Sequence, residues 1–192
     1  LTFRLNLPAR KLTLPGIKLT NLSIANASAA LMAFILLGQK IEYEANKIIE
    51  NTYLRGRCEI LNDRFIIDVS HNPAAVSNLS LFIKRTFKQN QKIIAVLGVM
   101  SDKDVLGMIG PLKSIVSKWY TTSPEISRAM SSLKLTEILK SIPEVIVEEV
   151  KSVKDAILRA HKNSPSNSII LILGSFYTVS EALPVIKTIK QN

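Results

Sequence analysis

The sequence predicts an α/β fold with a Rossmann-like, mostly parallel sheet covered by helices on both faces, preceded by a short α+β tail. Three observations carry this prediction. From Cys58 onward, apolar stretches rich in Ile and Val alternate with amphipathic stretches, which is typical of a parallel sheet that is buried on both faces. The 192 residues are 47% hydrophobic, enough for a packed core. Residues 1–55 lack the alternation, so they are predicted to be separate from a domain over 56–192.

The tail over 1–55 is predicted to contain short strands and two helices. Its elements, in chain order, are strands within 3–24 with breaks at Pro8 and Pro15-Gly16, a helix over 26–37, a helix over 42–52 and a linker over 54–56. The first helix is almost continuously apolar and should be buried. Asn26 is interpreted as its N-cap and Gly38 as its C-cap residue.

The domain over 56–192 is predicted to alternate strands and helices. Strands are expected at 59–61, 65–69, 93–97, 119–121, 145–148 and 169–173, and helices near 74–88, 104–117, 132–141, 152–163 and 177–190. Asn62-Asp63 favours a tight turn, so the first two strands should pair as an antiparallel hairpin at the sheet edge.

Composition excludes several classes of function. The net charge is +10, but Lys and Arg are scattered and aromatic residues make up only 6%, which argues against a nucleic-acid partner. A basic surface can still attract anionic substrates such as nucleotides. The longest apolar run, 25–38, is too short to span a bilayer.

Known site motifs are mostly missing from the sequence. It contains neither a G-x-x-x-x-G-K-[ST] phosphate loop nor a G-x-G-x-x-G fingerprint. His71 and His161 lack metal-ligand spacing with Cys58, so we expect no metal site. One cysteine gives no disulfide framework and no secretory signal opens the chain, so a cytoplasmic location is expected. We also expect a monomer.

The stretch over 65–73 is the most informative one in the chain. An apolar strand ends at Asp68, and Asn72-Pro73 then starts a helix. Asp68 and His71 should project from the rim where open α/β sheets bind ligands. Asp68 could accept hydrogen bonds from a ribose or cap the neighbouring turn. His71 could bind a substrate carboxylate, transfer a proton, or bond to the backbone.

Two further stretches have a functional and a structural interpretation. Gly174-Ser175-Phe176 follows the last predicted strand and opens the last helix. Its backbone N–H groups and the Ser175 hydroxyl could bind an anion or serve as an ordinary helix cap. Ser101 and Asp104 have capping-box spacing, with Lys103 pointing toward a phosphate as the alternative.

These motifs together resemble the folylpolyglutamate synthase/dihydrofolate synthase family, a branch of the Mur-ligase superfamily. The resemblance covers nearly the whole chain and matches the second half of the family's pattern. It rests on five motifs in order: Asn26-Ala27-Ser28-Ala29-Ala30; Gly56-Arg57 with Glu59; Asp68-Val69-Ser70-His71-Asn72-Pro73; Val96-Leu97-Gly98-Val99 with Asp102-Lys103-Asp104; and Gly174-Ser175-Phe176.

The resemblance implies roles for five residues. Asn26 would lie near the adenine of ATP, Arg57 would reach the phosphates and Asp68 would hold the ribose. His71 and Ser175 would contact the incoming glutamate, with His71 also the candidate catalytic residue. Without the resemblance, Arg57 is interpreted as a surface charge on a linker.

The resemblance also implies an activity and its partners. The family joins L-glutamate to dihydropteroate or to a folate with ATP, through an acyl phosphate, in folate biosynthesis. Residues 1–55 would end the ATP-binding domain, and 56–192 would be the glutamate-ligase domain. The phosphate loop and Mg²⁺ ligands would lie in the N-terminal ATPase domain, so this chain alone is expected to be inactive.

Two alternatives stay open. The chain could belong to another Mur-type ligase, one that joins amino acids to cell-wall precursors. It could also be a non-catalytic nucleotide-binding α/β module. The sequence does not decide whether dihydropteroate, a folate or both would be the substrate.

Overall fold

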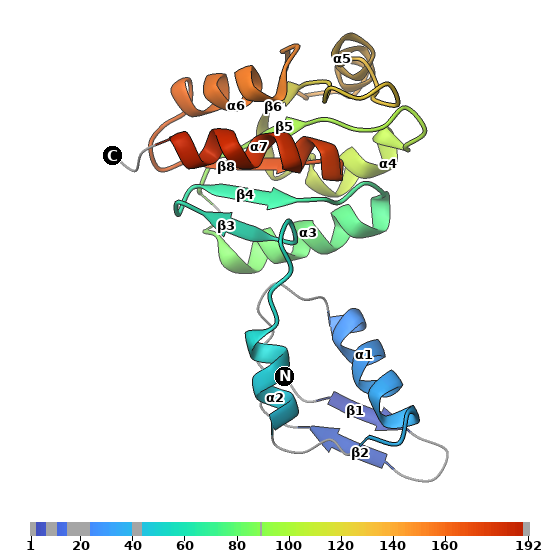
Figure 1. Cartoon of the computed structure of the whole chain (residues 1–192). Coiled ribbons are helices and arrows are strands. Elements are labelled where there is room, and N and C mark those ends of the chain that lie inside the picture. The colour runs from blue at the N-terminus through green and yellow to red at the C-terminus, as the bar shows by residue number, and fades with distance from the viewer. Residues whose placement is uncertain (1–2, 7–10, 15–23, 40–43, 89, 190–192) are drawn as a thin grey trace. The chain divides into compact units, whose positions relative to one another are not determined.

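The computed structural model describes residues 3–6, 11–14, 24–39, 44–88 and 90–189. The chain divides into two compact units, residues 1–55 and 56–192 (Figure 1). Pro8, Pro15 and Gly16, where strand breaks are predicted, lie outside the described residues.

The first unit holds a hairpin and two helices. Strands β1 (Phe3–Asn6) and β2 (Lys11–Leu14) pair antiparallel, followed by helices α1 (Ile24–Leu36) and α2 (Glu44–Asn51). Because α1 begins at Ile24, Asn26 is its third residue, and the prediction that Asn26 is the N-cap was wrong.

The prediction for Gly38 is confirmed. Gly38 has φ +77, its N–H donates to the Ile35 carbonyl at 2.9 Å, and the Gln39 N–H donates to the Phe34 carbonyl at 3.2 Å. These two bonds form the Schellman pattern that ends a helix. Glycine suits this position because φ is positive.

The second unit is built on a six-stranded sheet. Its strands are β3 (Glu59–Leu61), β4 (Phe65–Asp68), β5 (Ile93–Leu97), β6 (Val116–Thr121), β7 (Val147–Glu149) and β8 (Ile169–Leu173). Their order is β3-β4-β8-β5-β6-β7. All neighbours run parallel except β3 and β4, so the predicted mostly parallel α/β sheet is confirmed.

The predicted edge hairpin is also confirmed. Glu59 pairs with Ile67 and Leu61 with Phe65 in antiparallel register. Between them, the Arg64 N–H donates to the Leu61 carbonyl at 3.2 Å. Asn62 and Asp63 have φ +50 and +52, the positive φ values of a type I′ turn, and Asn and Asp tolerate this conformation.

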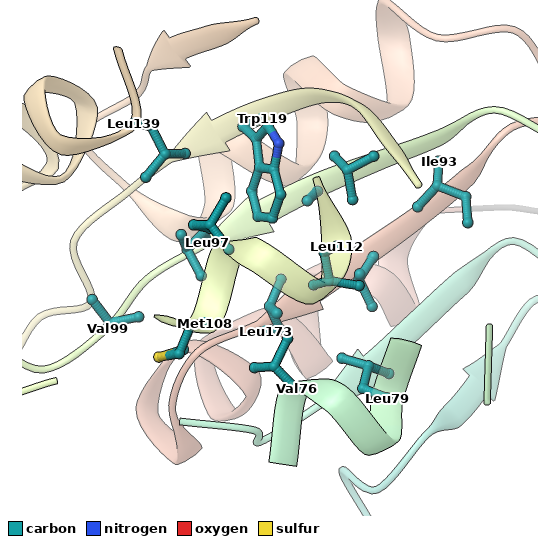
Figure 2. Close-up of a cluster of buried hydrophobic side chains, with 14 of the residues drawn as sticks. Val76, Leu79, Ile93, Leu97, Val99, Met108, Leu112, Trp119, Leu139 and Leu173 are labelled. Atoms are coloured by element: carbon teal, nitrogen blue, oxygen red, sulfur yellow. The ribbon is translucent and has the colours of Figure 1, made fainter. Parts of the chain in front are cut away.

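Helices cover both faces of the sheet. They are α3 (Pro73–Thr86), α4 (Val105–Ile109), α5 (Ser132–Lys140), α6 (Val153–Lys162) and α7 (Phe176–Thr188). Apolar residues of α3, α4 and α5 pack on one face, where Trp119, Leu97 and Leu173 lie among them (Figure 2). Apolar residues of α6 and α7 pack on the other face.

One predicted helix is much shorter than expected. Instead of a helix over 104–117, α4 ends at Ile109, a 3-10 turn covers Gly110–Leu112, and β6 starts at Val116. Pro111 lacks an N–H and therefore cannot continue the α-helical hydrogen bonds. The side chain of Asp104 accepts from the Gly107 N–H at 2.9 Å, so Asp104 is the N-cap of α4, and the capping box starting at Ser101 was wrong.

Arg64 ties the start of β4 to the end of α6, at the sheet edge opposite the strand ends discussed below. Its guanidinium donates to several groups there: the carbonyls of His161, Ser164, Pro165 and Ser168, the Ser164 hydroxyl, and His161 Nδ1 at 3.0 Å. Because a guanidinium can only donate, Nδ1 must accept and the imidazole is neutral. The ring also stacks on Phe65, with centroids 5.9 Å apart.

Acidification should therefore destabilise the second unit through His161. Burial, together with the Arg64 charge, lowers the pKa of His161, so the unfolded chain binds this proton more readily than the folded chain. The free energy of unfolding should be highest above the unfolded pKa of about 6.5 and should fall as the pH drops below it. Urea unfolding at about pH 7.5 and 5.5 measures the loss. His161→Gln should flatten this dependence, and an equally steep loss in that variant contradicts the assignment.

Candidate active site

The C-terminal ends of the central strands bring the predicted residues of the second unit to one rim. Asp68, the last residue of β4, pairs with Leu173, the last residue of β8, which also pairs with Leu97 of β5. Ser175 follows β8 by two residues. The prediction that Asp68 and Ser175 lie at the same sheet edge is confirmed.

Asp68 is buried, with 3% of its surface exposed, and both carboxylate oxygens accept hydrogen bonds. Oδ2 accepts from the Cys58 N–H at 2.8 Å and from the Cys58 thiol at 3.4 Å. Oδ1 accepts from the Ser70 N–H at 2.7 Å and from the Ser70 hydroxyl. This is the turn-capping arrangement, and a ribose hydroxyl could reach Asp68 only if the Ser70 hydroxyl or the Cys58 thiol turned away.

The Cys58 thiol keeps its proton in this arrangement. Burial raises its pKa far above the ordinary range, and the negative charge of Asp68 raises it further. A protonated thiol can donate to the carboxylate, whereas a thiolate would repel it. Cys58 therefore serves as a structural donor to Asp68.

A second buried carboxylate holds the segment that carries Arg57. Glu59, with 2% exposed, accepts from the Gly56 N–H at 2.8 Å. The Gly56 carbonyl in turn accepts from the Val69 N–H at 2.8 Å. Gly56 has φ +67, which glycine adopts without strain. The backbone on both sides of Arg57 is therefore fixed to the end of β4.

Arg57 itself is half-buried and directs its guanidinium toward the first residue of α7. Its Cζ lies 5.9 Å from the centre of the Phe176 ring, within the range of a cation–π contact. In the part of the chain that the structure describes, no carboxylate forms an ion pair with Arg57. Its N–H donors are therefore available to an anion.

His71 contacts the same aromatic ring. Its Nδ1 lies 2.9 Å from the Val69 carbonyl, and since a carbonyl only accepts, Nδ1 carries the proton. In the neutral imidazole this leaves the Nε2 lone pair as the acceptor. The His71 and Phe176 ring centroids are 6.1 Å apart at 43°. His71 thus bonds to the backbone and keeps a second functional nitrogen.

Ser175 is the N-cap of α7. Its hydroxyl accepts from the Thr178 N–H at 3.0 Å and lies 2.8 Å from the Thr178 hydroxyl, which donates to the Gly98 carbonyl at 2.7 Å. Gly174 has φ +114, and a Cβ there would meet the Gly98 oxygen at 2.5 Å. The helix-cap interpretation therefore describes the contacts of this buried serine, and glycine is required before it.

The structure also describes two other predicted residues. Asn26 belongs to the first unit, where it is exposed in the first turn of α1. Lys103 forms an ion pair with Asp102 at 2.7 Å. The sequence interpretation missed the role of Phe176 as a shared contact of Arg57 and His71. An aromatic residue directly after a helix-capping serine, at a rim, was the available signal.

The described residues of the two units contain neither a candidate metal site nor a membrane-spanning helix. They contain no group of three or more His, Cys, Asp or Glu side chains that could hold a metal ion. None of their helices combines the length and the apolar character needed to cross a bilayer.

Comparison with known families and proteins finds consistent matches. The model of the family described as Mur ligase, glutamate ligase domain, matches residues 56–176. The dihydrofolate synthase/folylpolyglutamate synthase of Escherichia coli K12 is 32% identical over 177 residues, which cover 91% of this chain and 40% of that protein. The protein of the same name from Buchnera aphidicola subsp. Baizongia pistaciae is 34% identical, over 84% of this chain and 38% of that protein.

Solved structures agree with these relatives. E. coli FolC in complex with DHPP and ADP superimposes with a TM-score of 0.81 at 32% identity, over 91% of this chain and 42% of that chain. The bifunctional folylpolyglutamate synthase/dihydrofolate synthase with Mn, AMPPNP and L-glutamate bound gives a TM-score of 0.81 at 27% identity. This match covers 95% of this chain and 43% of that chain. The chain thus spans about two fifths of the length of the relatives that it matches.

Proposed function

This chain belongs to the family of Mur ligase glutamate-ligase domains, and from that premise we propose that it forms the C-terminal part of an ATP-dependent ligase that adds L-glutamate to dihydropteroate or to a folate. The observation that carries the proposal is the convergence of Arg57, Asp68, His71 and Ser175 at one rim of the second unit. The named relatives favour the folate substrate over a cell-wall precursor.

We assign the nucleotide to the side of the rim that carries Arg57. Its guanidinium has no ion-pair partner among the described residues, and its planar fork suits phosphate oxygens. Asp68 remains the candidate for the ribose, with the Ser70 hydroxyl as the group to be displaced. Asn26 remains the candidate for the adenine.

Glutamate is assigned to His71 and Ser175. The Nε2 atom of His71 can accept from the glutamate ammonium or, when protonated, donate to a carboxylate. The N-terminus of α7, which Ser175 caps, carries partial positive charge that favours a carboxylate nearby. These two groups would orient the amine for attack.

The reaction would proceed in two steps. The carboxylate of the pteroate or folate attacks the γ-phosphorus of ATP and releases ADP, forming an acyl phosphate. The glutamate amine then attacks the acyl carbon, and the tetrahedral adduct loses phosphate and a proton. Arg57 would donate to the phosphate oxygens, where charge develops.

The other catalytic groups would come from the ATPase domain, and residues 1–55 would form the C-terminal end of that domain. The described residues do not fit a divalent metal site, so we assign the Mg²⁺ ligands and the phosphate loop to that domain. The assembled enzyme would work in the cytoplasm as a monomer.

The complete product of the gene should release phosphate from ATP when given L-glutamate with dihydropteroate or tetrahydrofolate. Residues 1–192 alone should show no turnover, because phosphoryl transfer depends on the phosphate loop that this sequence lacks. The assay is product formation by mass spectrometry with each acceptor.

Turnover by purified 1–192 contradicts the assignment of the catalytic parts to the ATPase domain. A complete protein that ligates only a cell-wall precursor contradicts the folate assignment. Nucleotide binding with no ligation of any acceptor favours the non-catalytic module.

A further inference from the structure

We propose that Phe176 is a positioning residue whose ring holds the Arg57 guanidinium and the His71 imidazole at the rim of the sheet. The inference rests on the proposed function, because it adds a residue to the same site. Phe176 is the first residue of α7, yet 59% of it is exposed. The core face of α7 is supplied by Val179, Ala182 and Ile186, so the ring of Phe176 is not needed there.

The ring joins two segments that are far apart in the sequence. Arg57 lies before β3 and places Cζ 5.9 Å from the ring centroid. His71 lies between β4 and α3 and places its own ring centroid 6.1 Å from that of Phe176. An aromatic face attracts a cation, and tilted rings attract each other. One side chain therefore contacts both residues that would face the phosphates and the glutamate.

The backbone beneath all three side chains is already fixed. Glu59 and Asp68 hold the residues on either side of Arg57, and the Val69 carbonyl holds one atom of the His71 ring, Nδ1. The cap at Ser175 fixes the backbone of Phe176. These contacts leave undetermined the direction of the long Arg57 side chain and the tilt of the His71 ring, and the Phe176 ring contacts both. Holding a side chain in its working orientation raises kcat, because misplacing a reacting or binding group by about 1 Å can lower the rate about 100-fold.

The positioning claim can be tested on residues 1–192 by NMR. A side chain that the ring holds is less mobile than one that extends freely into solvent, and NMR relaxation measures this mobility as an order parameter. Phe176→Leu should therefore lower the order parameters of the Arg57 Nε–H and His71 Cε1–H groups, whereas Tyr177→Leu should leave both unchanged. Tyr177 is a matched control, because it is the next residue on α7 and is 46% exposed. Unchanged order parameters of Arg57 and His71 in Phe176→Leu overturn the proposal.

The catalytic consequence is tested on the complete protein. Phe176→Leu should lower kcat about tenfold and raise the KM for glutamate, with the melting temperature unchanged. Phe176→Tyr should retain wild-type kinetics, as should Tyr177→Leu. In an Arg57→Ala background, Phe176→Leu should cost less than it does in the wild type, because residues that act together are not additive.

The outcomes separate this inference from the proposed function. If the wild-type complete protein ligates no acceptor, the proposed function fails, and the order parameters of Arg57 and His71 still decide whether Phe176 holds the two side chains. If the wild type is active and Phe176→Leu retains its kcat and KM, the positioning role is refuted. A lowered melting temperature together with normal kinetics would show a purely structural role and also refutes it.

Discussion

Replacing Arg57 with alanine in the complete protein should lower kcat about 100-fold or more, the usual cost of removing one donor to developing charge. The guanidinium lies at the rim on a backbone that Glu59 and Asp68 fix. Arg57→Lys should recover part of the loss, since it keeps the charge but not the planar fork. The KM for ATP should change less than kcat. Steady-state phosphate release at varied ATP measures both.

Arg85→Ala is the matched control for this experiment. Arg85 lies in the last turn of α3 and is exposed, so its loss removes the same charge away from the rim. It should leave kcat near the wild-type value. A kcat for Arg57→Ala within about twofold of wild type, which is about 0.4 kcal/mol, would mean that Arg57 does not meet the reacting phosphates.

Asp68→Ala should have the largest effect on stability. Removing the carboxylate leaves the buried N–H of Ser70 and the partly buried N–H of Cys58 without their acceptor. Each such loss costs about 1–3 kcal/mol, so the free energy of unfolding should fall by about 3 kcal/mol in total and the melting temperature by roughly 10 °C. If Asp68 also binds the ribose, the ATP dissociation constant should rise about tenfold, which is 1.4 kcal/mol.

Two measurements separate these effects. Thermal unfolding reports the contacts of Asp68 with Cys58 and Ser70, and ATP titration well below the melting temperature reports the ribose contact. Ser70→Ala is the matched variant, because it removes one of the four donors and keeps the carboxylate. It should cost about 1 kcal/mol and should not weaken ATP binding. An Asp68→Ala protein that melts normally contradicts the structural role, and one that melts early but binds ATP normally contradicts the ribose role.

The strands that the sequence predicted best are those buried on both faces. Ile93–Leu97 and Ile169–Leu173 were predicted with the same ends as β5 and β8. A run of five apolar residues is typical of a strand in a parallel sheet, because helices cover both of its faces. The hairpin at Asn62-Asp63 was predicted because its turn needs those residue types. The start of β6, residues 116–117, was mistaken for the end of a helix, since so short a stretch cannot distinguish the two periods.

The site was predicted less completely than the fold. The sequence predicts Asp68 at the rim because an apolar strand ends there. It does not predict that both carboxylate oxygens already accept hydrogen bonds from Cys58 and Ser70. That bonding needs Cys58 to turn back at φ +46, a conformation that is uncommon for residues other than glycine. The contacts of Phe176 with Arg57 and His71 join the first residue of α7 to two loop residues that are distant in sequence. An aromatic residue after a capping serine marks Phe176 itself, but no local pattern encodes its two partners.

The position of β8 also affects how the protein is made. β8 is translated after β4 and β5 but lies between them in the sheet. Until Ile169–Leu173 leave the ribosome, the nascent domain has two apolar strands with unpaired edges, which are prone to aggregate. An early stop codon before Ile169 therefore removes the middle of the sheet, and the truncated product should be cleared by proteases.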